Sequence, residues 1–306
     1  MSLFGTRGLR EFRKREFDRQ WRLFFSRQNW CGVLNFAAHR AALTLALPSS
    51  SGGGRRTKFF ALLGKIGMLK ELIDQFYLDQ QKNKEQTRFY ITDSGKCPRS
   101  VFFKFKNAPR KKMDARLLRI FEKGEYLHRN IFNILYRLRI GMTTEIPIPA
   151  QEIVSGRADA ILCINNENYV LDIKSMNSMV FRNLTEPKEE NIYQIQLYLH
   201  FFKIKKGILL YIDKDQQNIK EFQIEYDPNL TKSLLRDFEE LKKKIEADVV
   251  PKRFAGWPDN WQCQYCQFRE ICSMADGGEM NWNDFKNKIE SQSPQGMTGS
   301  EENNFS

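Results

Sequence analysis

Residues 156–174 constrain the fold more than any other stretch, because they have the pattern of a β-hairpin. Residues 157–164 form a short apolar run rich in β-forming side chains, and residues 169–173 form a second one. Between these runs stands Asn-Asn-Glu-Asn at 165–168, a composition typical of a turn. Helical patterns flank the hairpin on both sides, so the fold is expected to be of the α/β class.

Three charged residues stand at one end of this hairpin. Asp159 is near the start of the first strand and Asp172 near the end of the second, so an antiparallel return brings them together. Lys174 follows Asp172 by two residues and should point to the same face. Carboxylates hold Mg²⁺ or Mn²⁺, the metal acidifies a bound water, and a lysine can orient that water. The alternative is two ordinary strand-end acids with a surface cation. Glu145, just upstream, is expected at the surface, with a further acidic contribution to the site as the alternative.

Two helical segments carry further candidates. The helix expected over 114–138 places His128 on its apolar stripe, where a lone histidine is more often a core residue than a ligand. The helix expected over 191–203 carries Gln194 and Tyr198 four residues apart, hence on one face. In a nuclease, such a pair can hydrogen-bond a phosphate and stack on a base. Otherwise the pair is the polar edge of a buried helix.

Three of the six cysteines lie close together, which indicates a metal site rather than disulfides. They are Cys263, Cys266 and Cys272. A tetrahedral site needs a fourth ligand, for which Cys97 is the candidate. This ligand set would clasp the two ends of the domain together. Both Zn²⁺ and a [4Fe–4S] cluster accept four cysteines, and the spacing does not distinguish them.

The order of these motifs resembles the PD-(D/E)XK nuclease superfamily in its RecB-like branch, over about residues 88–275. The cysteines, with Cys97-Pro98-Arg99 near the start of this region, make the chain similar to the CRISPR-associated RecB-like exonucleases or to close viral and stand-alone relatives. The motifs that carry the resemblance are Gly124-x-x-x-His128, Gly156-Arg-Ala-Asp159, Asp172-Ile-Lys174 and Gln194-Ile-Gln-Leu-Tyr198.

The resemblance implies a metal centre at the hairpin. It implies that Asp159, Asp172, His128 and the backbone carbonyl of Ile173 hold Mg²⁺ or Mn²⁺. Lys174 would position the attacking water. For the histidine, this reverses the expectation that its place on the helix suggests.

The resemblance also implies the substrate contacts and the second cofactor. Gln194 and Tyr198 would hold the DNA strand. Cys97, Cys263, Cys266 and Cys272 would bind a structural [4Fe–4S] cluster, with Zn²⁺ as the alternative.

The function expected from the residues and the resemblance together is hydrolysis of DNA phosphodiester bonds. The resemblance suggests a cytoplasmic exonuclease that acts on single-stranded ends, in spacer acquisition beside a CRISPR integrase complex. A RecB-like or viral repair and recombination nuclease is the second interpretation. A catalytically silent DNA-binding scaffold is the third, although the intact set of two acids and a lysine argues against it. No run of 18 apolar residues is present, so no membrane span is expected.

The first 67 residues differ in composition from the rest. Residues 1–67 contain 13 Lys and Arg but only 3 Asp and Glu, and they account for most of the net charge of +12. The remainder is therefore nearly neutral, and bulk charge does not argue that it binds DNA. A misassigned start before Met68 or a poorly ordered extension is the favoured interpretation. A nucleic-acid arm and a targeting peptide are the alternatives.

Three further regions follow along the chain. Residues 68–250 are expected to form a restriction-endonuclease-like core, with a mixed central sheet flanked by helices and a first helix over 68–80 that packs on it. Residues 251–275 form the cysteine segment, clasped to the N-terminal part of the domain through Cys97. Residues 276–306 are polar and are expected to be disordered.

Overall fold

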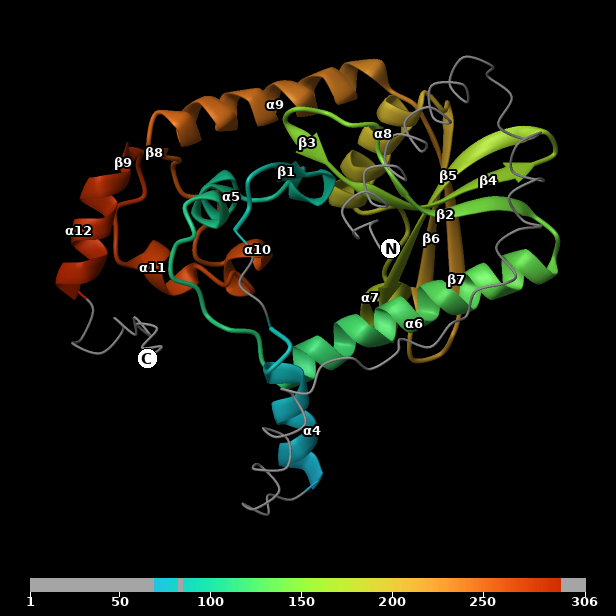
Figure 1. Cartoon of the computed structure of the whole chain (residues 1–306), viewed down its shortest axis with the longest axis horizontal. Coiled ribbons are helices and arrows are strands. Elements are labelled where there is room, and N and C mark those ends of the chain that lie inside the picture. Colours follow the sequence, from blue (N-terminus) through green and yellow to red (C-terminus); the bar gives the residue numbers. More distant parts are fainter. Residues whose placement is uncertain (1–68, 82–84, 293–306) are drawn as a thin grey trace, which may run out of the picture.

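The structure is a computed structural model that describes residues 69–81 and 85–292 (Figure 1). The expectations for residues 1–67 and for residues 293–306 lie outside the described residues. A sheet flanked by helices and a smaller region that carries the cysteines stand side by side, with α9 (Pro228–Glu246) running along both (Figure 1). Within the described part of the chain, no helix has the length and apolar character needed to cross a membrane.

The larger region is built on one five-stranded sheet of order β2-β4-β5-β6-β7. Strands β5 and β6 run parallel, and the other neighbours pair antiparallel, so the sheet is mixed. This confirms the expected α/β fold with a restriction-endonuclease-like core. The strands are β2 (Gly141–Pro147), β4 (Arg157–Ile164), β5 (Glu167–Met176), β6 (Lys206–Asp213) and β7 (Ile219–Glu225).

The predicted hairpin is the pair β4–β5. Its register runs from Ile164 opposite Glu167 to Ala160 opposite Leu171. Only two residues make the turn, Asn165 with φ 51° and Asn166 with φ 64°. Asparagine tolerates this left-handed backbone better than most residues, so the local sequence suits a two-residue connection. A short turn leaves little freedom to slip, which keeps the two acids on one face.

Helices cover both faces of the sheet. Helix α6 (Ala115–Arg137) packs Leu127 and Ile131 against one face, and its first turn is capped by Asp114, whose side chain accepts a hydrogen bond from the helix. Helix α8 (Glu189–Phe202) and α9 bury the opposite face. The smaller elements are β1 (Phe89–Tyr90), η2 (Ile91–Asp93), β3 (Val154–Ser155), α7 (Ser178–Arg182), β8 (Val249–Val250) and β9 (Met280–Asn281).

The cysteine-bearing region has its own apolar core, made by segments far apart in the sequence. Helix α5 (Pro98–Phe105) packs against α10 (Trp261–Gln264) and α11 (Arg269–Ser273) (Figure 1). The rings of Phe103 and Phe268, for example, lie 5.5 Å apart. The expected clasp between the cysteine segment and the N-terminal part of the domain is therefore present in the fold.

The polar tail is folded over its first part, which corrects the expectation of disorder from residue 276 onward. Helix α12 (Trp282–Gln292) packs into the core of the cysteine-bearing region. Phe285 is 0% exposed and Ile289 is also buried. Polar composition hid this helix, because a few apolar residues spaced along one stripe are enough to bury a short helix against an existing core.

Helix α4 (Leu69–Leu78) forms where a helix was predicted. The prediction that this helix packs on the core is wrong. None of its residues is buried. Polar contacts hold it on α6, through an ion pair of Asp74 with Arg119 and a hydrogen bond of Tyr77 with Glu122. An apolar stripe predicts which face of a helix can be buried, whereas the fold decides whether anything covers it.

Candidate active site

The two acids of the hairpin lie beside each other on β4 and β5. Asp159 stands one step beyond the pair Ala160–Leu171, which places it opposite Asp172. Asp159 Oδ2 accepts a hydrogen bond of 2.7 Å from the backbone N–H of Ile173. Asp172 is 1% exposed. The structure thus brings together the two carboxylates that antiparallel pairing predicts.

Lys174 lies on the same face and is held between two partners. Its Nζ is 2.9 Å from Asp172 Oδ2 and donates a hydrogen bond of 2.8 Å to Gln194 Oε1. Burial alone would lower the pKa of Lys174, but the charge of Asp172 and its hydrogen bond outweigh that effect and raise the pKa. The lysine is therefore a fixed cation beside the carboxylates at neutral pH.

His128 reaches the same place from α6. Its Nδ1 lies 3.5 Å from Asp159 Oδ2. Burial lowers the pKa of His128, although the charge of Asp172 and a hydrogen bond with the backbone of Ile173 oppose the shift. The imidazole is therefore neutral near pH 7 and keeps a lone pair for a metal ion. The side chains and the backbone group that were predicted as metal ligands all lie together.

The carboxylate pair is under electrostatic strain. Burial, followed by the charge of Asp172, raises the pKa of Asp159 to about 7. Asp172 Oδ2 is buried and accepts no hydrogen bond of normal geometry, although Lys174 Nζ is close. A divalent cation would relieve both conditions, so the donor set suits Mg²⁺ or Mn²⁺ in type and charge. Across residues 69–81 and 85–292, no group of three or more His, Cys, Asp or Glu side chains is arranged to hold a metal ion, and this applies to the acids of the hairpin and to the cysteines alike.

Gln194 and Tyr198 are buried and bonded within the protein in this structure, and their predicted DNA contact stays a prediction. Gln194 is 8% exposed and Tyr198 is 2% exposed. The Tyr198 hydroxyl donates a hydrogen bond of 2.7 Å to the carbonyl of Arg157, and its ring stacks on Phe202. Gln194 also bonds the ammonium of Lys174 directly, so it supports the lysine as well.

Glu145 is exposed, as expected, and it also acts on the site electrostatically, which was the less favoured alternative. It lies on β2 across from Asp159, where the β2–β4 ladder skips one pair, and it has a φ of 55°. Its carboxylate is partly exposed and forms an ion pair with Arg157, with Nε and Oε2 2.6 Å apart. The charge of Glu145 nevertheless raises the pKa of Asp159 and counters the lowering at His128.

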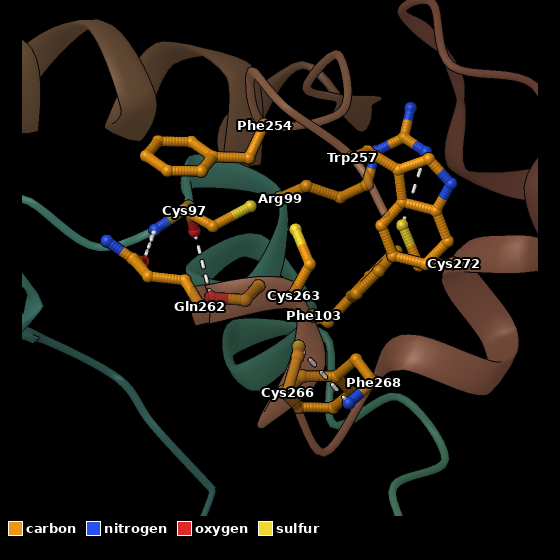
Figure 2. Close-up of a pocket in the computed structure, with 11 residues that line it drawn as sticks. Cys97, Arg99, Phe103, Phe254, Trp257, Gln262, Cys263, Cys266, Phe268 and Cys272 are labelled. Atoms are coloured by element: carbon orange, nitrogen blue, oxygen red, sulfur yellow. Dashed lines mark hydrogen bonds between the residues drawn. The ribbon is translucent and has the colours of Figure 1, made fainter. Parts of the chain in front are cut away.

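The four candidate cysteines line one pocket (Figure 2). Cys97 stands at the start of α5, and Cys263, Cys266 and Cys272 come from the segment around α10 and α11. The side chain of Gln262 joins the two segments. It accepts a hydrogen bond of 2.9 Å from the Cys97 N–H and donates one of 2.8 Å to the Gly95 carbonyl.

The chemistry of this pocket suits a thiophilic metal group. Its lining contains four sulfur atoms but no carboxylate and no imidazole. Burial raises the pKa of the Cys97 thiol to about 11, and burial also raises the pKa values of Cys263 and Cys266. These thiols are therefore protonated without a metal, and metal binding must displace the protons. Zn²⁺ and an iron–sulfur cluster both fit such a donor set.

Comparisons of the sequence place this chain among known nucleases. The sequence profile of the PD-(D/E)XK nuclease superfamily matches residues 72–273. The CRISPR-associated exonuclease Cas4 of Saccharolobus solfataricus is 30% identical over 198 residues, which span 62% of this chain and 89% of that protein.

Two solved structures are similar in part. The crystal structure of SSO0001 has a TM-score of 0.47 at 26% identity, covering 67% of this chain and 96% of the other. The alkaline exonuclease LHK-Exo from Laribacter hongkongensis has a TM-score of 0.38 at 14% identity, covering 56% of this chain and 93% of the other.

Proposed function

This chain belongs to the PD-(D/E)XK nuclease superfamily, as a relative of the CRISPR-associated exonuclease Cas4, and from this premise we propose that it is a metal-dependent exonuclease acting on single-stranded DNA ends. The reaction is hydrolysis of a phosphodiester bond. The observation that carries the proposal is the convergence of Asp159, Asp172 and Lys174, with His128 beside them.

Each residue has a distinct task in this mechanism. Asp159, Asp172, His128 and the carbonyl of Ile173 would hold Mg²⁺ or Mn²⁺, and the bound metal supplies an acidified water and neutralises charge on the phosphate. Lys174 orients the attacking water and lies beside the negative charge that develops on the phosphate oxygens. Water adds to phosphorus, the bond to the leaving oxygen breaks, and that oxygen takes up a proton.

Gln194 and Tyr198 keep the lysine in place. Gln194 accepts a hydrogen bond from one of the three N–H groups of the Lys174 ammonium. The remaining N–H groups therefore point toward Asp172 and the reacting side. Tyr198 holds the helix end against the backbone of Arg157. This arrangement fixes the direction in which Lys174 donates, and correct direction is a large part of catalysis.

The four cysteines are the proposed ligands of a structural [4Fe–4S] cluster, with Zn²⁺ as the alternative. A cluster at Cys97, Cys263, Cys266 and Cys272 would tie α5 to the segment that follows residue 251. On this proposal, residues 68–250 are the nuclease core and the cysteine segment is its brace. A metal group at the cysteines would contribute to the stability of the fold and not to the reaction, since this pocket is separate from the acids of the hairpin.

The proposed biological setting is the cytoplasm, where the protein would trim DNA ends for spacer acquisition beside a CRISPR integrase. Its support is the relationship to a CRISPR-associated exonuclease. Integrase genes beside the gene for this chain would favour this setting, whereas helicase or replication genes would favour a repair or recombination nuclease.

The test of the proposed reaction is digestion of end-labelled single- and double-stranded DNA with Mn²⁺, Mg²⁺ or EDTA. Protein purified without air would be compared with Asp172→Asn, which keeps the shape of the side chain and removes its charge. Glu167→Gln is the matched control, because Glu167 lies on the same strand at its far end and pairs with Lys206. Metal-dependent shortening lost only in Asp172→Asn supports the proposal. Equal cleavage by Asp172→Asn rejects the site, and no cleavage by folded, metal-loaded protein favours the silent scaffold.

A further inference from the structure

Arg99 is a buried arginine whose donors are all occupied. It follows Cys97 by two residues, at the start of α5, and it is 1% exposed. A guanidinium has five N–H groups, and Arg99 has five acceptors. Four are backbone carbonyls and one is the sulfur of Cys272, which lies 3.8 Å from Nη1. The carbonyls are those of Pro251 (2.6 Å), Asp276 (3.1 Å), Gly277 (3.4 Å) and Gly278 (2.6 Å).

None of these five partners is a carboxylate. Within the residues that the structure describes, no Asp or Glu oxygen forms an ion pair with Arg99. The nearby side chain of Asp276 is exposed and pairs with Lys288, which is the main reason that its pKa is lowered, and the charges of Arg253 and Arg99 add to this lowering without contact. Carbonyl dipoles satisfy the hydrogen bonds of a guanidinium, but they do not balance its charge. A buried, permanently charged group with no anion in contact is costly.

A second arginine repeats the pattern beside the same cysteine. Arg253 donates hydrogen bonds of 2.7 and 3.2 Å to the carbonyl of Cys272, and it also contacts the carbonyls of Ser273 and Ala275. Its guanidinium lies over the ring of Trp257, 4.9 Å from the centroid. Two guanidinium groups therefore converge on the end of α11 at Cys272. Arg99 and Cys272 line the sulfur-rich pocket (Figure 2).

We propose that Arg99, together with Arg253, supplies the positive charge that balances an anionic metal–thiolate group at the four cysteines. Arg99 also positions Cys272 to bind this metal group. A doubly charged cation or cluster core held by four thiolates carries a net negative charge. The guanidinium of Arg99 touches one of those sulfurs and balances that charge from a direction that water does not reach. This inference rests on the proposed cysteine site and adds to it the residues that set its affinity.

The same contacts connect the metal group to the C-terminal part of the fold. Arg99 holds the carbonyls of residues 276–278, which lead directly into β9 and α12. Loss of the metal would leave the Arg99 charge unbalanced in the middle of this contact. The stability of the C-terminal segment should then depend on metal occupancy.

The test measures metal affinity in the full chain, reduced and freed of metal without air. Co²⁺ is the probe, because thiolate ligation gives it charge-transfer absorption in the near-ultraviolet and d–d bands in the visible. Replacing a residue that supports a metal ligand typically weakens binding by about 10- to 100-fold, and this range is expected for Arg99→Met. Arg99→Lys keeps the positive charge but loses the planar guanidinium, so its Co²⁺ affinity should lie between those of Arg99→Met and the unchanged protein. Arg236→Met is the matched control, since Arg236 is an exposed arginine on α9, and it should bind as the unchanged protein does.

Thermal unfolding with and without Zn²⁺ separates this role from a merely structural one. A counter-charge predicts that Arg99→Met loses more stability in the metal-loaded protein than in the metal-free protein. Equal losses in both states, or Co²⁺ binding by Arg99→Met as tight as in the unchanged protein, would overturn the inference. If Arg99→Met does not fold, the same measurements are made on Arg253→Met, for which we expect about a 10-fold loss of Co²⁺ affinity. Failure of the unchanged protein to bind Co²⁺ through thiolates would overturn the cysteine site as well, whereas the nuclease test with Asp172→Asn would stand.

Discussion

Gln194 accepts a hydrogen bond of 2.8 Å from the ammonium of Lys174, which joins α8 to the charged end of β5. Because the lysine also contacts Asp172, its side chain is held from two sides. Gln194 of α8 therefore supports the lysine of the candidate site, and the predicted DNA contact of Gln194 and Tyr198 stays a prediction.

Replacing Gln194 should impair turnover more than DNA binding. Gln194→Leu removes the acceptor and lets Lys174 swing away. Misplacement of about 1 Å can cost roughly 100-fold in rate. We expect kcat to fall by about that factor with KM nearly unchanged, measured with single-stranded DNA and saturating Mn²⁺. Gln223→Leu, at an exposed position of β7, is the control. A rise in KM with unchanged kcat would instead support a direct contact of Gln194 with DNA.

The stability of the metal-free protein should depend on pH through Asp159. Its pKa is raised to about 7 in the folded chain, against roughly 3.9 for an ordinary aspartate. Between these values the folded state binds the proton more tightly than the unfolded state, so stability should fall as pH rises from about 4 to about 7. The size is of the order of 4 kcal/mol. Asp159→Asn should remove most of this slope.

Urea unfolding in EDTA, at several pH values across that window, measures the effect. Mn²⁺ added at neutral pH should stabilise the unchanged protein, because it replaces the proton between the carboxylates. An identical pH slope in Asp159→Asn would show that another group titrates.

Gln262 should contribute to stability through the two hydrogen bonds that join α10 to residues 95–97. Gln262→Ala removes both bonds and should cost about 1–2 kcal/mol of unfolding free energy. Gln264→Ala is a close control, since Gln264 is exposed and bonds only within its own segment. Chemical denaturation of the metal-loaded protein measures both. Equal effects of the two variants would argue that the two hydrogen bonds of Gln262 do not stabilise the contact between α10 and residues 95–97.

The burial of Phe285 predicts that α12 is an integral part of the fold. Phe285→Ala leaves a cavity beside Phe103 and should destabilise the protein by about 3–5 kcal/mol. Glu290→Ala, on the exposed side of the same helix, should change the unfolding free energy by less than about 0.5 kcal/mol. Thermal or urea unfolding distinguishes the two. A small effect of Phe285→Ala would mean that the helix is only loosely attached.

The sequence by itself determined the hairpin and the residues at its end. Strand periodicity, the two asparagines of the turn and the spacing of Asp159, Asp172 and Lys174 are local properties, and a short turn allows one register. The cysteine pattern likewise required a fourth ligand from elsewhere, and the structure places Cys97 in the same pocket.

Only the tertiary structure decided how the remaining groups face one another. Helical spacing puts Gln194 and Tyr198 on one side of α8, but the packing of α8 on the sheet turns that side inward. The five acceptors of Arg99 come from residues 152 or more positions away along the chain, so no local pattern reveals them. Burial and long-range hydrogen bonding depend on which segments meet, and that information appears only when the chain is folded.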